Sequence, residues 1–163
     1  MGIKNILIIA IFILSVLFWQ TKRIRLFRRV DSLKRIKAFI INVSYEIRSS
    51  KRNVFDIIGA DKTGLDLFKN VSMNGELLYI YYLKAKEKNL GSMCLESGDE
   101  GILDRFFREL GQGDVISQLR LCEDSITALD VCLVDALDRS KKYGKLYTVA
   151  GFSMGTFAVI MLL

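Results

Sequence analysis

The stretch ILDRFFRELGQGDVISQ, residues 102–118, ends one predicted helix and begins another. Before its turn, large apolar residues recur three or four positions apart, which predicts a single buried helical face. These residues are Ile102, Leu103, Phe106, Phe107 and Leu110. Gly111 and Gly113 are suited to the positive φ that ends a helix, and Asp114 is suited to cap the next helix. Because the apolar spacing resumes at Val115 and continues to Ala136, the sequence predicts an antiparallel helical hairpin.

The composition favours a helical chain with part of its length in lipid. Of the 163 residues, 51% are hydrophobic, and the mean hydropathy of +0.27 is high for a soluble domain. Proline, which interrupts helices, is absent, so we expect an all-α fold. Histidine is also absent, and with it the commonest acid–base group and metal ligand. We therefore expect no catalytic residues, no cofactor and no metal. Cys94, Cys122 and Cys132 lack zinc-site spacing and are expected to be reduced core residues.

The N-terminal segment from Ile6 to Trp19 is interrupted only by Ser15, so it is a minimal span for a bilayer core of about 30 Å. A cleaved signal peptide is the alternative, because the apolar run has a suitable length. The segment lacks a small-residue cleavage site, however, and basic residues follow it, as they follow the cytoplasmic end of a membrane helix. These basic residues are Lys22, Arg23, Arg25, Arg28 and Arg29.

The C-terminal segment from Leu146 to Leu163 carries no charge and is long enough for a second span. It is preceded by Lys141, Lys142 and Lys145, so basic residues flank the inner ends of both segments. The positive-inside rule then places the intervening chain in the cytoplasm and both termini outside it. The expected organisation is a transmembrane helix at 1–21, a cytoplasmic α-helical domain at 22–145 and a transmembrane helix at 146–163.

Two further amphipathic helices are predicted between these spans. Apolar residues from Leu33 to Ile47 alternate at spacings of three and four, and a second helix is expected from Leu77 to Lys88, ending at Asn89 to Gly91. The region from Lys22 to Ala60 holds eleven basic and three acidic residues. This charge suits anionic lipid or an acidic partner, or belongs to a solvated flank, and a nucleic-acid role is not expected beside a membrane span.

The charge is reversed between Glu96 and Asp138, a region that contains eleven acidic and three basic residues. An acidic end that does not adjoin the membrane is free to meet a charged cytoplasmic partner. Acidic side chains that fall off the apolar stripe are the candidates for such an interface, although a charged face is also compatible with simple solvation. The candidates are Glu109, Glu123, Asp124 and Asp130.

Gly151, Ser153 and Gly155 spell the G-x-S-x-G pattern of hydrolase nucleophiles, but that site needs a strand–turn–helix context and a histidine. The same stretch contains G-x-x-x-G within an apolar segment, where small residues let helices approach closely in lipid. Helix packing through Gly151 and Gly155 is therefore the prediction, with plain exposure to lipid as the alternative.

The order of these features resembles the stage III sporulation protein AB family of endospore-forming bacteria. The resemblance covers nearly the whole chain: a short N-terminal span, a helical domain, a central LxxFxxxLGxxDxxxQ pattern and a lysine-flanked C-terminal span. The central pattern is formed by Leu103, Phe106, Leu110, Gly111, Asp114 and Gln118. The closing pattern is formed by Lys142, Gly144, Leu146, Gly151, Leu162 and Leu163.

This resemblance implies an antiparallel helical bundle similar to the cytoplasmic domain of the platform protein of type II secretion and type IV pilus machines. It also implies a platform in a secretion-like channel between mother cell and forespore, in the mother-cell-derived membrane. The implied partners are a cytoplasmic secretion-type ATPase encoded in the same operon, other membrane subunits of the channel and further copies of the chain. A membrane sensor with a helical relay domain is the alternative function, and an enzyme built from carboxylates, serine and lysine is a third.

Overall fold

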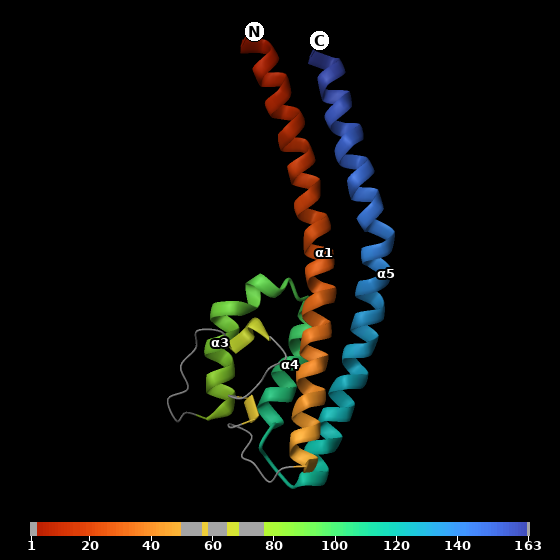
Figure 1. Ribbon diagram of the computed structural model, residues 1–163. Helices are drawn as coiled ribbons and strands as arrows, with labels where there is room; N and C mark the ends of the chain where they lie inside the picture. The colour runs from red at the N-terminus through yellow and green to blue at the C-terminus, as the bar shows by residue number, and fades with distance from the viewer. Residues whose placement is uncertain (1–2, 50–56, 59–64, 69–76, 163) are drawn as a thin grey trace. The chain divides into compact units, whose positions relative to one another are not determined.

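The computed structural model describes residues 3–49, 57–58, 65–68 and 77–162, and among them it contains helices and no strand (Figure 1). The long elements are α1 (Ile3–Ser49), α3 (Leu78–Met93), α4 (Ser97–Glu109) and α5 (Val115–Leu162), with a short 3₁₀ helix, η1 (Asp66–Phe68). The predicted all-α fold is confirmed. The side chains of residues 3–9, 11, 66, 158, 159, 161 and 162 lie outside the description, and many of them belong to the two predicted membrane spans.

The chain divides into two compact units, and each of the two long helices contributes to both. The central unit comprises residues Arg29–Asp135, and the terminal unit comprises Met1–Arg28 together with Ala136–Leu163. Over the described residues, no helix combines the length and the hydropathy needed to cross a membrane.

The core of the central unit is an aromatic cluster around Phe107 of α4. Its ring stacks on Tyr82 of α3, with 4.4 Å between centroids, and lies 6.0 Å from the ring of Phe39 on α1. Phe68 of η1 meets the same ring edge-on at 5.5 Å. Phe106, the neighbour of Phe107, is fully buried as well. One ring therefore joins three helices and η1, and aromatic contacts of this kind add to the free energy gained by apolar burial.

Two details of the central unit differ from the sequence prediction. α3 does not end at Asn89 to Gly91 but continues to Met93, where Cys94 takes the left-handed conformation that closes it. The extra turn buries Leu90 and Met93, so tertiary packing outweighs the weak helix preference of Gly91. Val115, expected in the apolar stripe, is 57% exposed because it is the first residue of α5, and the inward position one turn later is filled by Gln118.

In the terminal unit, α1 and α5 run antiparallel and meet where glycines of α5 face aromatic side chains of α1. A Cβ atom added to Gly155 would lie 2.7 Å from Cδ2 of Phe12, and one added to Gly151 would lie 3.1 Å from Cβ of Trp19. Both glycines are buried. The predicted packing stretch therefore lies at a helix–helix contact, in which the absence of a side chain makes room for a ring.

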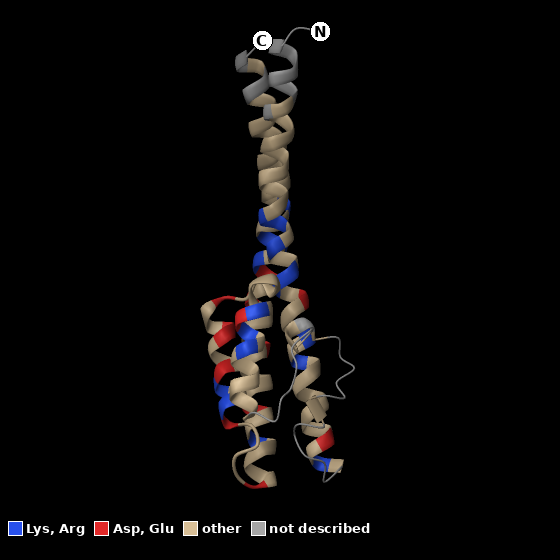
Figure 2. Cartoon of the chain, turned by 90° about the vertical axis from the view of Figure 1, so that its left-hand side faces the viewer, with Lys and Arg blue, Asp and Glu red and all other residues tan. Residues whose placement is uncertain are grey.

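The outward surface of the terminal unit is apolar beyond one band of charge. Figure 2 shows the charged residues of this unit gathered in a band on its two helices, with uncharged residues elsewhere on its coloured part. Large apolar side chains exposed by more than half of their area are Leu14, Leu17, Phe18, Leu146, Val149, Phe152, Met154, Phe157 and Ile160. α5 thus turns glycines toward α1 while both helices expose large apolar residues, whereas a water-soluble bundle exposes polar residues.

Candidate functional site

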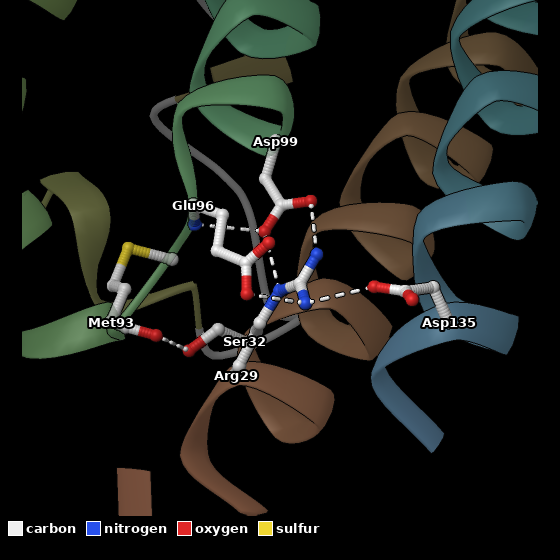
Figure 3. A network of polar contacts seen from close by, with 6 residues as sticks. All are labelled: Arg29, Ser32, Met93, Glu96, Asp99 and Asp135. Atoms are coloured by element: carbon white, nitrogen blue, oxygen red, sulfur yellow. Dashed lines mark hydrogen bonds and ion pairs between the residues drawn. The ribbon is translucent and has the colours of Figure 1, made fainter. Parts of the chain in front are cut away.

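A buried polar network of the central unit is built around Arg29, the residue at which α1 enters that unit (Figure 3). Its guanidinium binds Asp99 of α4 through two nitrogens, Nε to Oδ2 at 2.8 Å and Nη2 to Oδ1 at 3.0 Å. Nη1 reaches Glu96 at 2.9 Å and Asp135 of α5 at 3.2 Å. Arg29 is 5% exposed and Asp99 1%, whereas the carboxylates of Glu96 and Asp135 are partly open to solvent. One cation therefore joins three helices.

Asp99 also forms the N-terminus of α4. Its Oδ2 accepts the backbone N–H of Glu96 at 2.9 Å, and the Glu96 side chain accepts the N–H of Asp99 in return, which is a reciprocal capping box. The same carboxylate therefore satisfies a helix end and neutralises Arg29. Nearby, the Ser32 hydroxyl donates to the Met93 carbonyl at 2.9 Å and ties α1 to the end of α3.

The electrostatics of this network favour charged forms of both central groups. Hydrogen bonding to Asp99 raises the pKa of Arg29 above its usual range, and this outweighs the lowering effect of burial. Burial acts to raise the pKa of Asp99, but the hydrogen bonds from Arg29 and from the Glu96 backbone lower it below the ordinary value. A carboxylate kept ionised in this way is a poor general acid at neutral pH, so the network is suited to holding helices together.

A second polar cluster joins α3 to α4. Asp104 accepts hydrogen bonds from the Tyr82 hydroxyl at 2.6 Å and from the Lys86 ammonium at 2.8 Å. Burial is the largest influence on Tyr82 and raises the pKa of its hydroxyl far above the ordinary value. Burial raises the pKa of the Cys122 thiol to about 11, which keeps that sulfur protonated and unreactive.

The hairpin turn between α4 and α5 is organised by the side chain of Gln118. Gly111 and Gly113 have φ values of +83° and +101°, and the N–H of Gly111 donates to Gln118 Oε1 at 2.8 Å. The Gln118 amide donates in turn to the carbonyls of Glu109 and Gln112. Asp114 caps α5 by accepting the N–H of Ser117 at 3.2 Å. Leu103, Phe106 and Leu110 are buried beneath this turn, so the residues of the central sequence pattern form one structural group.

The basic residues predicted to flank the membrane do not share one environment. Arg29 belongs to the buried network and not to an exposed flank, because its side chain pairs with Asp99 inside the central unit. The others lie in the terminal unit at partly or fully exposed positions. On α1 these are Lys22, Arg23, Arg25 and Arg28, and on α5 they are Lys141, Lys142 and Lys145.

The four acidic residues predicted as a partner interface are also divided. Asp130 is ion-paired with Lys37 of α1, and Glu109 is paired with Arg105 one turn earlier on α4 at 3.3 Å. Glu123 and Asp124 remain on the exposed side of α5. The sequence could not separate these cases, because the partner of Asp130 comes from a helix distant in the chain.

Glu123 and Asp124 belong to a continuous exposed face of α5 in the central unit, which we call the outer α5 face. Its residues are Ile116, Arg120, the adjacent pair Glu123 and Asp124, Thr127, Val131 and Val134, and all are exposed. Ile116 is 76% exposed, Val131 70% and Val134 60%. Carboxylates flanked by solvent-exposed apolar side chains are better suited to a protein–protein contact than to catalysis.

A family model described as stage III sporulation protein AB matches residues 4–163, nearly the whole chain. No curated protein and no solved structure was found to match.

Proposed function

The chain belongs to the stage III sporulation protein AB family, and from this premise we propose that it is a non-enzymatic platform subunit of a secretion-like channel between mother cell and forespore. In this role the terminal unit lies in the mother-cell-derived membrane around the forespore, with both termini outside the cytoplasm. The central unit faces the cytoplasm and docks a secretion-type ATPase encoded in the same operon. Other membrane subunits of the channel and further copies of the chain are its remaining partners.

The membrane placement is supported by the surface of the terminal unit. Its exposed side chains are large and apolar away from the charged band, and soluble monomers rarely expose contiguous apolar areas of such extent. The basic residues at 22–28 and 139–145 lie next to these apolar segments, as expected for the cytoplasmic flanks of membrane helices.

The non-enzymatic role is supported by the chemistry of the polar groups. The chain contains no histidine, the pKa values of Asp99 and Asp104 are lowered, and burial raises the pKa of Cys122 to about 11. Proton transfer at neutral pH favours groups with a pKa near the working pH, and these shifts move the groups away from it.

The observation that carries docking is the outer α5 face. Interface residues gain most affinity when apolar side chains are buried at the centre of the contact, and Ile116 and Val131 expose most of their surface on this face. Glu123 and Asp124 lie between them along α5 and would steer a basic partner surface toward the face.

The docking experiment uses the full-length protein in nanodiscs and the purified ATPase. Ile116→Glu combined with Val131→Glu should weaken binding at least roughly tenfold, a change of about 1.4 kcal/mol. The matched control is Ile41→Glu combined with Tyr45→Glu, because these α1 side chains are 48% and 66% exposed and lie outside the outer α5 face. Equal losses in the two double variants, or no loss in either, would place the contact elsewhere.

The contribution of charge is tested separately. Glu123→Lys with Asp124→Lys should slow association, and the slowing should be greater at low salt than at high salt because surface charges are screened over about 8–10 Å at physiological salt. An effect independent of salt would remove steering from the proposal while leaving the apolar contact in place.

Topology is tested by labelling in intact vegetative cells that express the protein, because there the membrane that holds it borders the medium. A cysteine placed at the exposed Glu87, in a chain lacking Cys94, Cys122 and Cys132, should react with an impermeant maleimide only after the cells are opened. Reaction in intact cells would reverse the orientation and exclude docking in the cytoplasm.

A further inference from the structure

A hollow of about 560 Å³ lies between α1 and α5 within the terminal unit. We call it the basic groove, and its lining residues are Arg23, Phe27, Ser140, Lys141, Gly144, Lys145, Thr148 and Val149. Gly144 forms part of its floor, where an added Cβ atom would lie 3.4 Å from the Phe27 ring. The groove therefore depends on a glycine opposite an aromatic ring, as the other contacts of this unit do.

Three cations from two helices converge on this groove, and in the described part of the chain none of them has a carboxylate partner. Lys141 and Lys145 follow one another by one turn of α5, and Arg23 faces them from α1. The Arg23 guanidinium lies 5.6 Å from the centroid of the Phe27 ring, an arrangement that holds it by a cation–π contact. Asp138, the one acidic residue among the described positions of the terminal unit, does not line the groove. Such a site favours a singly or doubly charged anion.

The remaining lining residues add two further preferences. The Thr148 hydroxyl is partly exposed and donates to the Gly144 carbonyl at 3.1 Å, so its remaining lone pair can accept from a ligand that carries hydroxyl groups. The Ser140 hydroxyl donates to the Leu137 carbonyl at 2.9 Å and is buried. Phe27 is 49% exposed and Val149 63%, which leaves an apolar wall beside the cations. A small inorganic anion would use the cations alone, whereas an acylated phosphate diester would also cover this wall.

We infer that the basic groove binds the headgroup of an anionic phospholipid with a hydroxylated headgroup, of which phosphatidylglycerol is the simplest. The phosphate diester lies among Arg23, Lys141 and Lys145, and the first methylenes of an acyl chain lie along Phe27 and Val149. This inference rests on the membrane placement in the proposed function. It adds a site with a preference for one class of headgroup to a surface that otherwise contacts lipids of any headgroup.

Trp19, the single tryptophan of the chain, reports on this site because it lies one turn of α1 from Arg23. The full-length protein is placed in phosphatidylcholine bilayers in which about one tenth of the lipid carries brominated acyl chains. At this low fraction, an anionic lipid that concentrates at the basic groove can be distinguished from lipid that is distributed at random. Brominated phosphatidylglycerol should quench the fluorescence of Trp19 at least roughly twice as strongly as the same fraction of brominated phosphatidylcholine, as expected if the groove concentrates the anionic lipid.

The test variant combines Arg23→Gln, Lys141→Gln and Lys145→Gln, and it should abolish the difference between the two lipids. Its matched control removes the same number of charges from the same two helices outside the groove, and it should keep the difference. The control substitutions are Lys22→Gln, Arg25→Gln and Lys142→Gln. The single substitutions Lys141→Gln and Lys145→Gln, both at exposed positions, should each reduce the difference in quenching between the two lipids in part. If the triple variant does not fold, these single variants test the inference.

Three outcomes would overturn the inference. The first is equal quenching by the two lipids in the unmodified protein, and the second is an equal loss in the test and control variants, which would indicate diffuse charge attraction. The third is loss of the lipid preference when inorganic phosphate replaces chloride at constant ionic strength, which would indicate a free-anion site. Failure of ATPase docking with the lipid preference intact would instead count against the platform function alone.

Discussion

In the central unit α1 and α5 bury large side chains and an ion-pair network, whereas in the terminal unit the same two helices meet through glycine. Phe39 and Leu129 are fully buried in the first, and Gly151 and Gly155 hold the corresponding inward positions in the second. Burial from water stabilises packing of the first kind. Close fit of surfaces stabilises the second, as it does between helices in lipid, where the hydrophobic effect no longer distinguishes inside from outside.

The largest test of this comparison is Phe106→Ala in the central unit. Phe106 is fully buried, so the substitution should cost about 3–5 kcal/mol through lost burial and the cavity left behind. That is a large part of the stability of a small domain. Denaturant unfolding of the full-length protein measures it, and a change below about 1 kcal/mol would show that the central core is not the dominant source of stability.

Arg29→Met tests the ionic part of the same interior. The substitution should cost about 3 kcal/mol because it leaves the buried Asp99 without its cation, although the N–H of Glu96 still serves that carboxylate. Arg28→Met is the matched control, because Arg28 is exposed and its substitution should change stability by less than about 0.5 kcal/mol. Similar losses in the free energy of unfolding for the two variants would mean that the Arg29 network does not stabilise the packing of the helices.

Gly155→Ala tests the fit of the terminal unit. The new methyl group would overlap the Phe12 ring, so we expect a loss of about 1–3 kcal/mol from overpacking. Gly91→Ala in α3 adds the same group where no atom lies within 4 Å, and it should stabilise the protein by about 0.5–1 kcal/mol. Thermal unfolding in detergent compares the two, and stabilisation by both would rule out a close approach at Gly155.

The smallest expected effect is the change in how the stability of the central unit depends on pH, and it appears only in acid. The pKa values of Asp99 and Asp104 are below the ordinary 3.8, because hydrogen bonds from their partners outweigh burial. A carboxylate with a lowered folded pKa stabilises fully above its unfolded pKa, and this stabilisation is lost as the pH falls through the folded value. Asp99→Asn should therefore flatten the loss of stability below about pH 4. Unfolding midpoints of the parent protein and of this variant across a pH series measure the difference.

Periodicity predicted the helices and the hairpin but not the pairing of their charges. Arg29 stands four residues before Leu33, and Asp99 four residues before Leu103, so each continues an apolar stripe by one step. That position marks both side chains as inward-facing, a signal that the basic run around Arg29 concealed. Which inward cation meets which inward carboxylate depends on the order in which the helices pack, and spacing along one helix does not specify it.

The candidate interface was predictable only in part, for the same reason. Glu123 and Asp124 fall on the exposed side of α5 by spacing alone. Asp130 lies closer to the buried side of α5, where it forms an ion pair with Lys37 of α1. The apolar members of the outer α5 face, such as Val131, interrupt an otherwise polar surface, and only the packed structure shows that no described helix covers them.

The glycine contacts of the terminal unit also fix when this unit can form. Phe12 and Gly155 are separated by almost the whole chain, so α1 emerges from the ribosome long before its partner exists. At about 5–20 residues per second the interval is of the order of ten seconds. Asp135, the last residue of the central unit, is synthesised about 1–4 s before Gly155, so the central unit is complete before the contact between the two ends can form. A chain that stops before Gly144 would retain the first helix with its aromatic face uncovered, a form that quality-control proteases can distinguish from the finished protein.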